Sequence, residues 1–359
     1  MFEKLSMVEV FYEEMRVGIL ALATDHRCLF EYDPVWINEG FSISPFYLPL
    51  KSGLFTAKAD PFDGLFGVFN DSLPDGWGRL LTDRWLMSKG YHPADLTVLD
   101  RLSLIGDGGM GALIYSPGQN TKDEKSNREI AFYAIEAAKI LHADYTGSLD
   151  ELVSKAGSSG GARPKILITI DGVDWLIKFK ATMDPDDIGI IEYEHSILAG
   201  KCGIEMPETR LFEGKYFGVK RFDRENAKRI HSHSAAGLLY ASHRLPSLDY
   251  ASLMKATMAL TKDINEVAKL FRQMVFNVLI GNKDDHSKNF SYLYKNGTWQ
   301  LSPAYDLLPS YGFNNNHTTT INGKGKPEIK DCMELARQTS FPEKSAKKII
   351  DEVLEGLKS

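Results

Sequence analysis

The segment GNKDDHSKNFSYLYKNGTWQLSPAYD, residues 281–306, carries the pattern that decides the fold. It follows the stretch DINEVAKLFRQMVFNVLI, whose large apolar side chains repeat every three or four residues, and Gly281 stands where such a helix would stop. Asp284 and Asn289 then lie on the loop that leaves this helix. A short hairpin with an Asn-Gly turn separates them from Asp306. The segment therefore predicts a buried helix, a polar loop, a hairpin and a final aspartate.

This order of parts is the one that kinase-type phosphoryl transfer uses: a loop aspartate, an asparagine five residues later, a hairpin and a second, metal-binding aspartate. Hard cations such as Mg²⁺ prefer oxygen ligands, which Asn289 and Asp306 would supply. A further carboxylate beside the nucleophile orients the hydroxyl and accepts its proton, a role that suits Asp284. Taken alone, the loop is equally typical of a solvated surface loop, so the other parts of such a site must be sought elsewhere.

A phosphate cradle and a lysine are present upstream. The stretch GSSGGARPK, residues 157–165, offers glycines that let backbone N–H groups approach phosphate oxygens. A predicted hairpin follows, and its second strand ends in Ile177, Lys178 and Phe179. Glu192 or Glu194, on the next predicted helix, is a candidate partner for that lysine. A glycine-rich loop or a strand-end lysine is usually an ordinary structural feature, so the interpretation depends on their conjunction.

Length and composition limit the alternatives. With 359 residues and 43% hydrophobic content, the chain is long enough for at least two lobes. A net charge of -6 and a pI near 5.9 argue against a broadly basic nucleic-acid surface. Three cysteines, Cys28, Cys202 and Cys332, lie far apart without a CxxC pair, so we predict neither a zinc site nor a disulfide framework.

The same features favour a reducing, cytoplasmic location. The N-terminus has no basic start followed by an apolar run, and no stretch approaches the roughly 18 to 20 apolar residues that a membrane-spanning helix needs. We therefore expect neither secretion nor a membrane span. The polar stretch at residues 116–127 is expected to be a linker or an exposed loop.

Taken together, the chain resembles the HipA family of bacterial toxin-antitoxin serine/threonine kinases. The resemblance covers nearly the whole chain and is carried by LPDGWGRLL, LIGDGGMGAL, SSGGARPK, WLIKF, the helix ending LAGKCGI, VKRFDR, NKDDHSKNFS and LSPAYD. It implies an α+β, two-lobed, protein-kinase-like fold with a mixed, β-rich N-terminal region and an all-helical C-terminal region. The implied domains are an N-terminal module at 1–118, a kinase N-lobe at 119–235 and a helical C-lobe at 236–359.

The resemblance also implies roles for individual residues. Asp284 matches the catalytic base, Asn289 and Asp306 match Mg²⁺ ligands, and Lys178 matches the lysine that contacts the phosphates of ATP. The other ATP-binding positions that it implies are Gly160, Gly161, Ala162, Arg163, Pro164, Lys165, His231, Ser232, His233, His286, Lys288 and Tyr305. The hinge segment RIHSHSAAGLL departs from the family's common acidic pattern.

Ser158 matches the loop serine that members of this family autophosphorylate, and Ser159 beside it is a competitor. A phosphate there would bring roughly two negative charges into the loop that must receive ATP, so we expect it to switch the enzyme off. The alternative is a serine that merely serves the turn.

Proteins of this family phosphorylate translation components, typically an aminoacyl-tRNA synthetase, and are neutralised by a helix-turn-helix antitoxin that binds operator DNA. We expect the antitoxin to be a separate chain, so that contact with DNA would be indirect. Trp77 and Trp85 are candidates for its docking face, although core packing is the commoner role for such residues. Arg221 and Asp223 would either brace the nucleotide cleft or form a structural ion pair.

Two other functions fit the same residues. The pattern D-x-H-x-x-N also resembles the catalytic loop of phosphoinositide kinases, which would make the chain a small-molecule or lipid kinase. A catalytically silent module that sequesters a partner or co-represses transcription is the second alternative. A scaffold has no physical need for Lys178, Asp284, Asn289 and Asp306 together, which favours an enzyme.

Overall fold

The computed structural model describes residues 4–119, 128–143, 148–158 and 160–358. Most of the predicted linker at 116–127 lies outside these ranges. The chain forms two compact units, of which the first comprises Met1–Ile190 with Arg210–His231 and the second Ile191–Thr209 with Ser232–Ser359. All three cysteines are free thiols in buried positions. Among the described helices, none combines the length and the apolar character needed to cross a bilayer.

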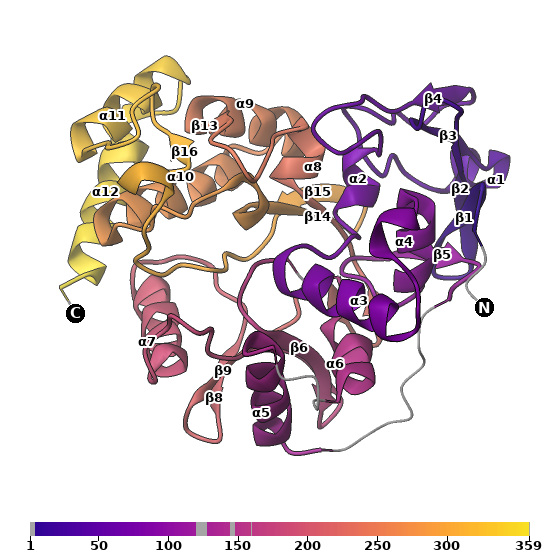
Figure 1. Cartoon of the computed structure of the whole chain (residues 1–359). Coiled ribbons are helices and arrows are strands. Elements are labelled where there is room, and N and C mark those ends of the chain that lie inside the picture. The colour runs from indigo at the N-terminus through magenta and orange to yellow at the C-terminus, as the bar shows by residue number, and fades with distance from the viewer. Residues whose placement is uncertain (1–3, 120–127, 144–147, 159, 359) are drawn as a thin grey trace. The chain divides into compact units, whose positions relative to one another are not determined.

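The first unit begins with an antiparallel sheet in the order β4-β3-β2-β1-β5, in line with the β-rich N-terminal region expected from the sequence (Figure 1). Its strands are β1 (Met7–Tyr12), β2 (Met15–Leu22), β3 (Cys28–Tyr32), β4 (Leu54–Thr56) and β5 (Leu113–Ser116). The helices of this region are α1 (Pro34–Glu39), α2 (Gly67–Asn70), α3 (Gly76–Ser88), the short 3₁₀ helix η1 (Pro93–Asp95) and α4 (Val98–Ile105).

A second sheet of the same unit has the order β6-β7-β9-β8. It consists of β6 (Lys165–Ile170), β7 (Val173–Lys178), β8 (Thr209–Phe212) and β9 (Tyr216–Lys220), with helices α5 (Ile130–Leu141) and α6 (Leu149–Ala156) and the short ladder of β10 (Arg224–Glu225) and β11 (Lys228–Arg229). Asp171 and Gly172 form the predicted turn between β6 and β7, both with positive φ, as a tight hairpin requires. Trp77 and Leu81 of α3 are buried in the same core as Ile166 and Ile177 of this hairpin.

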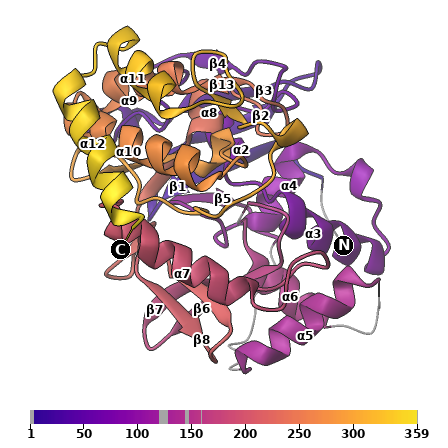
Figure 2. The same ribbon diagram turned by 90° about the vertical axis from the view of Figure 1, so that its left-hand side faces the viewer.

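Helix α7 (Ile188–Lys201) runs from the first unit into the second, which is mainly helical. Its other helices are α8 (Ala235–Leu239), α9 (Tyr250–Thr261), α10 (Ile264–Ile280), α11 (Ile329–Gln338) and α12 (Glu343–Gly356). Figures 1 and 2 show α9 and α12 beside α10, and the three pack together. Asp263 caps α10 by accepting a 2.8 Å hydrogen bond from the N–H of Asn265, and Gly281 ends it with a φ of 71°.

The hairpin predicted after α10 is present. Strands β14 (Ser291–Lys295) and β15 (Thr298–Leu301) pair in antiparallel register and extend to β12 (His231–Ser234) in a three-stranded sheet. The remaining short elements are β13 (Leu248–Asp249), which pairs in parallel with β16 (Thr319–Thr320), and the 3₁₀ helices η2 (Ser287–Asn289) and η3 (Phe313–Asn315). The mainly helical unit therefore also contains strands, and the predicted loop lies between α10 and β14.

Candidate functional site

The loop from Asp284 to Asn289 joins the end of α10 to the start of β14. The Asp284 side chain is exposed, whereas Asn289 is buried. The Nδ2 atom of Asn289 donates a 2.7 Å hydrogen bond to the backbone carbonyl of Asp284, which closes the loop on itself. Because the nitrogen of the amide is used in this way, its oxygen is the atom suited to a hard cation.

Asp285 anchors this loop, and the sequence reasoning assigned it no role. Its side chain is fully buried, and its two carboxylate oxygens accept hydrogen bonds from the Tyr250 hydroxyl (2.9 Å), His317 Nδ1 (2.9 Å) and the backbone N–H groups of Thr318 (2.9 Å) and Thr319 (3.2 Å). Burial first, and the nearby carboxylate second, raise the pKa of Tyr250 well above the ordinary tyrosine value, so this phenol stays a donor. Asp285 therefore fixes the loop from inside.

A chain of polar side chains connects this loop with the segment that carries Asp306. Asn282 donates from Nδ2 to the Oδ1 of Asn277 (3.0 Å) and to the backbone carbonyl of Asp306 (3.1 Å). The Ser310 hydroxyl donates to Asn282 Oδ1 (2.8 Å) and accepts from the backbone N–H of Asp284 (3.0 Å). One buried asparagine thus ties the backbones of the two predicted functional aspartates together.

Asp306 adopts an uncommon backbone conformation, with a φ of 55°, and its side chain is exposed. Aspartate tolerates the left-handed region better than most residues, and such conformations often occur at functional sites. The preceding residue, Tyr305, is turned toward the loop. Its hydroxyl donates to the Lys288 carbonyl (2.7 Å) and lies 2.6 Å from the Ser291 hydroxyl, so this predicted ATP-binding residue braces the loop.

His286 carries a polar atom that fits a ligand. Its Nδ1 is buried and has no hydrogen-bond partner within the described part of the chain, while its ring lies 6.3 Å from the ring of His243. Buried polar atoms are nearly always satisfied, so an orphan nitrogen beside Asp284 indicates a position where a bound group or water would complete the site.

In the first unit, the glycine-rich loop precedes β6 and closes on itself. Lys165 is buried, and its ammonium group donates to the Gly160 carbonyl. Lys165 and Lys178 are directly opposed in the β6–β7 register, and the Lys178 ammonium lies 5.6 Å from the centre of the Phe217 ring. Like charges at opposed positions repel each other, and an anion bound near the loop would relieve that repulsion.

Two of the other loop positions have contacts of their own. Arg163 forms a two-pronged ion pair with Asp184, through Nε (2.9 Å) and Nη2 (3.0 Å). The carbonyl of Pro164 accepts the N–H of Phe179 at 2.8 Å, which continues the hairpin. These contacts hold the loop against the region after β7.

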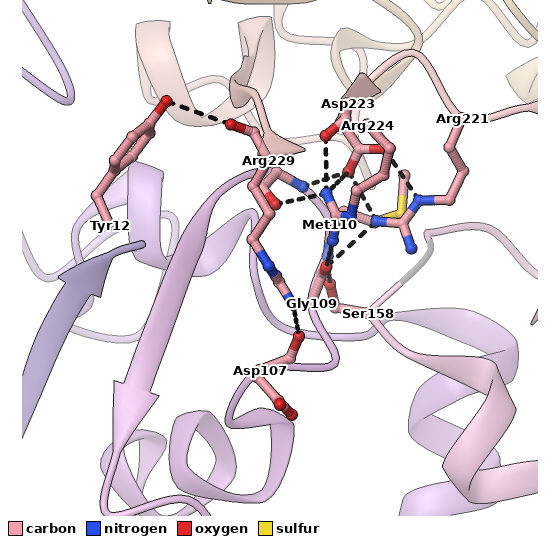
Figure 3. Close-up of polar contacts among 10 residues, drawn as sticks. Tyr12, Asp107, Gly109, Met110, Ser158, Arg221, Asp223, Arg224 and Arg229 are labelled. Atoms are coloured by element: carbon pink, nitrogen blue, oxygen red, sulfur yellow. Dashed lines mark hydrogen bonds and ion pairs between the residues drawn. The ribbon is translucent and has the colours of Figure 1, made fainter. Parts of the chain in front are cut away.

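Ser158 is buried, with 2% of its surface exposed, and its hydroxyl accepts a 2.7 Å hydrogen bond from the N–H of Met110 (Figure 3). The same peptide group presents the Gly109 carbonyl to Arg221 Nη2 (3.3 Å) and Arg224 Nη2 (3.0 Å). The competing position, Ser159, lies outside the described residues.

Figure 3 also shows the ion-pair cluster around Asp223, which confirms that the predicted structural ion pair exists. Asp223 is fully buried, pairs with Arg221 (2.8 Å) and Arg224 (2.9 Å) and accepts the N–H of Gly111 (2.6 Å). Burial alone would raise the pKa of Asp223, but the charge and hydrogen bonds of Arg221 outweigh it and hold that pKa below its ordinary value. Burial lowers the pKa of Arg224 to about 10, although the charge of Asp223 opposes this shift.

The predicted hinge begins with a histidine whose side chain is engaged elsewhere. His231 is 1% exposed, its Nε2 lies 2.8 Å from the Ile43 carbonyl, and its ring packs near Phe41. Any contact of this residue with adenine would therefore come from its backbone. His233 is also buried, whereas Ser232 is partly exposed.

The two candidate partners of Lys178 differ in their environment: Glu192 is buried and Glu194 is exposed. A buried carboxylate needs a partner, which makes Glu192 the better candidate. Lys178 and the glycine loop belong to the first unit, whereas Asp284, Asn289 and Asp306 belong to the second. That these residues converge on one nucleotide stays a prediction.

Within the described residues, no group of three or more His, Cys, Asp or Glu side chains is arranged to hold a metal ion. A Mg²⁺ site of the predicted kind does not need one, because it uses one or two protein oxygens together with phosphate oxygens and water. The amide oxygen of Asn289 and the exposed carboxylate of Asp306 fit that requirement.

Several known proteins are similar to this chain. "Putative kinase Y4dM" of Sinorhizobium fredii is 25% identical over 97% of this chain and 88% of its own length. "Putative kinase Y4mE" of the same organism is 28% identical over 79% of this chain and 72% of its own length. Among solved structures, HipA from the Shewanella oneidensis complex of HipA, HipB and operator DNA matches with a TM-score of 0.72 and 18% identity, over 98% of this chain and 88% of that one.

The structural match shows that the two chains share a fold. Two family models match the sequence. The model of the HipA N-terminal domain matches residues 8–116, and that of the HipA-like C-terminal domain matches residues 157–359. With matches over both domains and a shared fold across nearly its full length, the chain belongs to the HipA family.

Proposed function

We propose that the chain is a serine/threonine protein kinase that transfers the γ-phosphoryl group of ATP to a protein hydroxyl. The observation that carries the proposal is the hydrogen-bonded network of the second unit, which holds Asp284 and Asp306 through Asn282 and Ser310. Two relatives named as kinases support the same general activity.

In this proposal Asp284 is the catalytic base. The substrate oxygen attacks the γ-phosphorus, the bond from that phosphorus to the oxygen bridging the β- and γ-phosphates breaks, and ADP leaves. Asp284 accepts the hydroxyl proton, which its exposed position allows. Lys178 and the loop ending at Lys165 bind the phosphates. Asn289 and Asp306 would hold Mg²⁺, which when bound neutralises charge on the phosphates.

Replacing the proposed base tests this assignment. Asp284→Ala should lower phosphotransfer from labelled ATP at least about a hundredfold, because general-base catalysis contributes on that order. The fold should be unaffected, since the side chain is exposed. Asp351→Ala, an exposed aspartate on α12, is the matched control and should keep full activity.

The location of the label separates the alternatives. Phosphate on protein, including the chain itself, supports the proposal, whereas label confined to lipids or metabolites would indicate a small-molecule kinase. Unchanged activity in Asp284→Ala would refute the base, and a wild-type chain with no phosphotransfer at all would favour a silent binding module.

The regulation and the partners that we propose follow the family. Ser158 would be autophosphorylated, and the substrate in the cytoplasm would be a translation component such as an aminoacyl-tRNA synthetase. A separate helix-turn-helix antitoxin would bind the chain and carry it to operator DNA, in line with the solved complex of HipA, HipB and operator DNA, whose HipA chain shares this fold. Phosphoproteomics after brief expression, against Asp284→Ala, would identify the substrate. Tight operator binding by the chain alone would contradict the separate antitoxin.

A further inference from the structure

Asp75 stands at the N-terminus of α3 but does not cap it. Aspartate at this position usually accepts an N–H from the first turn of its own helix. Here no such side-chain cap is formed. The carboxylate instead accepts the N–H of Gly161, 86 residues away in the glycine-rich loop. A Cβ added to Gly160 would lie 3.3 Å from both carboxylate oxygens, so the carboxylate lies directly against two consecutive loop residues.

The contact is reciprocal. The Trp77 backbone N–H, one of the first-turn groups that the helix itself cannot satisfy, donates to the Gly161 carbonyl at 3.0 Å. The Trp77 indole Nε1–H donates to the Lys165 carbonyl at 3.2 Å. The glycine loop therefore caps α3, and α3 in turn supplies hydrogen-bond partners at the centre and at the end of the loop.

Glycines make this close approach possible. Gly76 has a φ of 39°, and a Cβ there would lie 2.4 Å from the Gly161 carbonyl oxygen and 2.9 Å from the Ala162 Cα. Gly161 has a φ of 98°. A side chain at position 76 would push the two backbones apart and break the exchange of hydrogen bonds.

Helix α3 is well placed to hold the loop, because its buried side chains share a core with the hairpin that follows the loop. Trp77 and Leu81 are almost completely buried in the core that contains Ile166 and Ile177 of the β6–β7 hairpin. Asp75 therefore projects from a helix whose buried face belongs to the same core as the strand that follows the loop. The loop is held at its centre by contacts with Asp75 and Trp77, and at its end by the hairpin that follows it.

We propose that Asp75 is a positioning residue for the phosphate loop, so that the N-terminal domain supplies part of the nucleotide-binding lobe. The inference deepens the proposed kinase function and rests on it. Asp75 fixes the Gly160–Gly161 segment in the conformation that receives ATP phosphates, and the Gly161 N–H serves as a structural donor to Asp75. Without that acceptor, the loop samples conformations that do not bind phosphate.

The test measures nucleotide affinity and loop order separately in the full-length chain. Titration calorimetry with Mg²⁺ and ATP should show about tenfold weaker binding for Asp75→Ala, the loss expected when a charged hydrogen-bond acceptor is removed. Asp75→Asn keeps an acceptor and should restore part of the affinity. In steady-state assays KM for ATP should rise while kcat stays nearly constant, because the base and metal ligands are untouched.

Asp33→Ala is the matched control. Asp33 also stands at a helix N-terminus in the N-terminal domain, where it accepts the Val35 N–H at 2.8 Å and pairs with Arg16 at 2.7 Å. Its loss should lower Tm without changing the affinity for ATP, since it lies at α1 and has no part in the glycine loop. A purely structural role of Asp75 would give the same result as this control.

Hydrogen exchange measures the order of the loop without any need for catalysis. In the nucleotide-free chain, Asp75→Ala should speed exchange of the backbone amides at Gly160–Arg163 and Lys165 while α3 stays protected. Unchanged exchange together with unchanged ATP affinity would overturn the proposal, and tighter ATP binding would overturn it by showing that the carboxylate competes with phosphate. A wild-type chain that binds no ATP would refute the kinase function, while the exchange experiment would still decide whether Asp75 orders the loop.

Discussion

Asp284 and Asp285 are neighbours with opposite environments. The first is exposed, and the second is fully buried with hydrogen bonds from two side chains and two backbone N–H groups. The side chain of Asp285 faces the protein interior, whereas that of Asp284 faces solvent. The exposed aspartate is available for chemistry because the buried one holds the loop.

This division of roles predicts opposite outcomes for two matched substitutions. Asp285→Asn places an amide NH₂ among hydrogen-bond donors, so the free energy of unfolding should fall by about 3 kcal/mol, as for a broken buried polar network. Asp284→Asn should change it by less than about 0.5 kcal/mol while abolishing phosphotransfer. Urea denaturation and a labelled-ATP assay measure the two effects. Equal stability of the two variants would contradict the anchoring role.

At the scale of elements, the glycine loop is held by two segments of the N-terminal domain. Asp75 and Trp77 contact its centre and end, and Met110 donates to Ser158 at its start. A Cβ at Gly157, which has a φ of 54°, would lie 2.8 Å from the Gly108 carbonyl oxygen. The described positions of the loop are therefore fitted against this domain, and the buried Ser158 hydroxyl would have to leave this contact before a phosphate could be added to it.

A charge at Ser158 should keep the loop open. The hydroxyl is buried and accepts an N–H, so a carboxylate in Ser158→Asp cannot remain in that position without a costly buried charge. We expect this variant to lose ATP binding in calorimetry. Ser158→Ala, which is small and neutral, should retain it. ATP affinity of the wild-type value in Ser158→Asp would contradict the proposed switch.

At the scale of the whole molecule, the cluster around Asp223 joins segments that are distant in sequence. Asp223 accepts the N–H of Gly111, 112 residues away, and Arg224 donates to the carbonyls of Gly109 and Gly111. These contacts connect the HipA N-terminal domain with the strands that follow β9 inside the first unit. Within the first unit, the regions that match the two family domains are therefore joined by buried polar contacts.

The lowered pKa of Asp223 predicts how this connection depends on pH. A carboxyl group whose pKa is lower in the folded state contributes stability that is present above its unfolded pKa, near 3.8, and is lost as the pH falls through the folded value. Asp223→Asn should therefore cost about 3 kcal/mol of unfolding free energy at pH 7, and less as the pH falls below 4.

Urea midpoints at pH 7, 5 and 3.5 would check this expectation. Asp25→Asn, which breaks an exposed ion pair with Arg27, is the control and should change the midpoint little at any pH. A constant difference between Asp223→Asn and the wild type across this range would show that the ionised carboxylate is not what stabilises the cluster.

Local sequence determined much of the architecture. Asp-Gly and Asn-Gly pairs favour tight hairpin turns because both residues tolerate positive φ, and both turns are present. Helix α10 begins at its aspartate cap and ends at Gly281, because helix caps depend only on residues within the first and last turns. The position of Asp284 and Asn289 on one loop could also be predicted from the sequence, since it follows from the end of the buried helix before them.

Only the tertiary structure decided which polar side chains became internal supports. Asp75 and Asp285 look like ordinary turn or loop aspartates in sequence, yet Asp75 accepts the N–H of Gly161, 86 residues away, and the side chains that donate to Asp285 lie 32 and 35 residues away. Asp223 pairs with the neighbouring Arg221, as its sequence suggests, but it also accepts the N–H of Gly111, 112 residues away. Whether a carboxylate is exposed or buried depends on which distant backbone groups fold against it, and no local pattern specifies that contact. Local sequence thus determined the turns and helix ends of this protein, whereas contacts between distant segments determined which aspartates are buried and which are exposed.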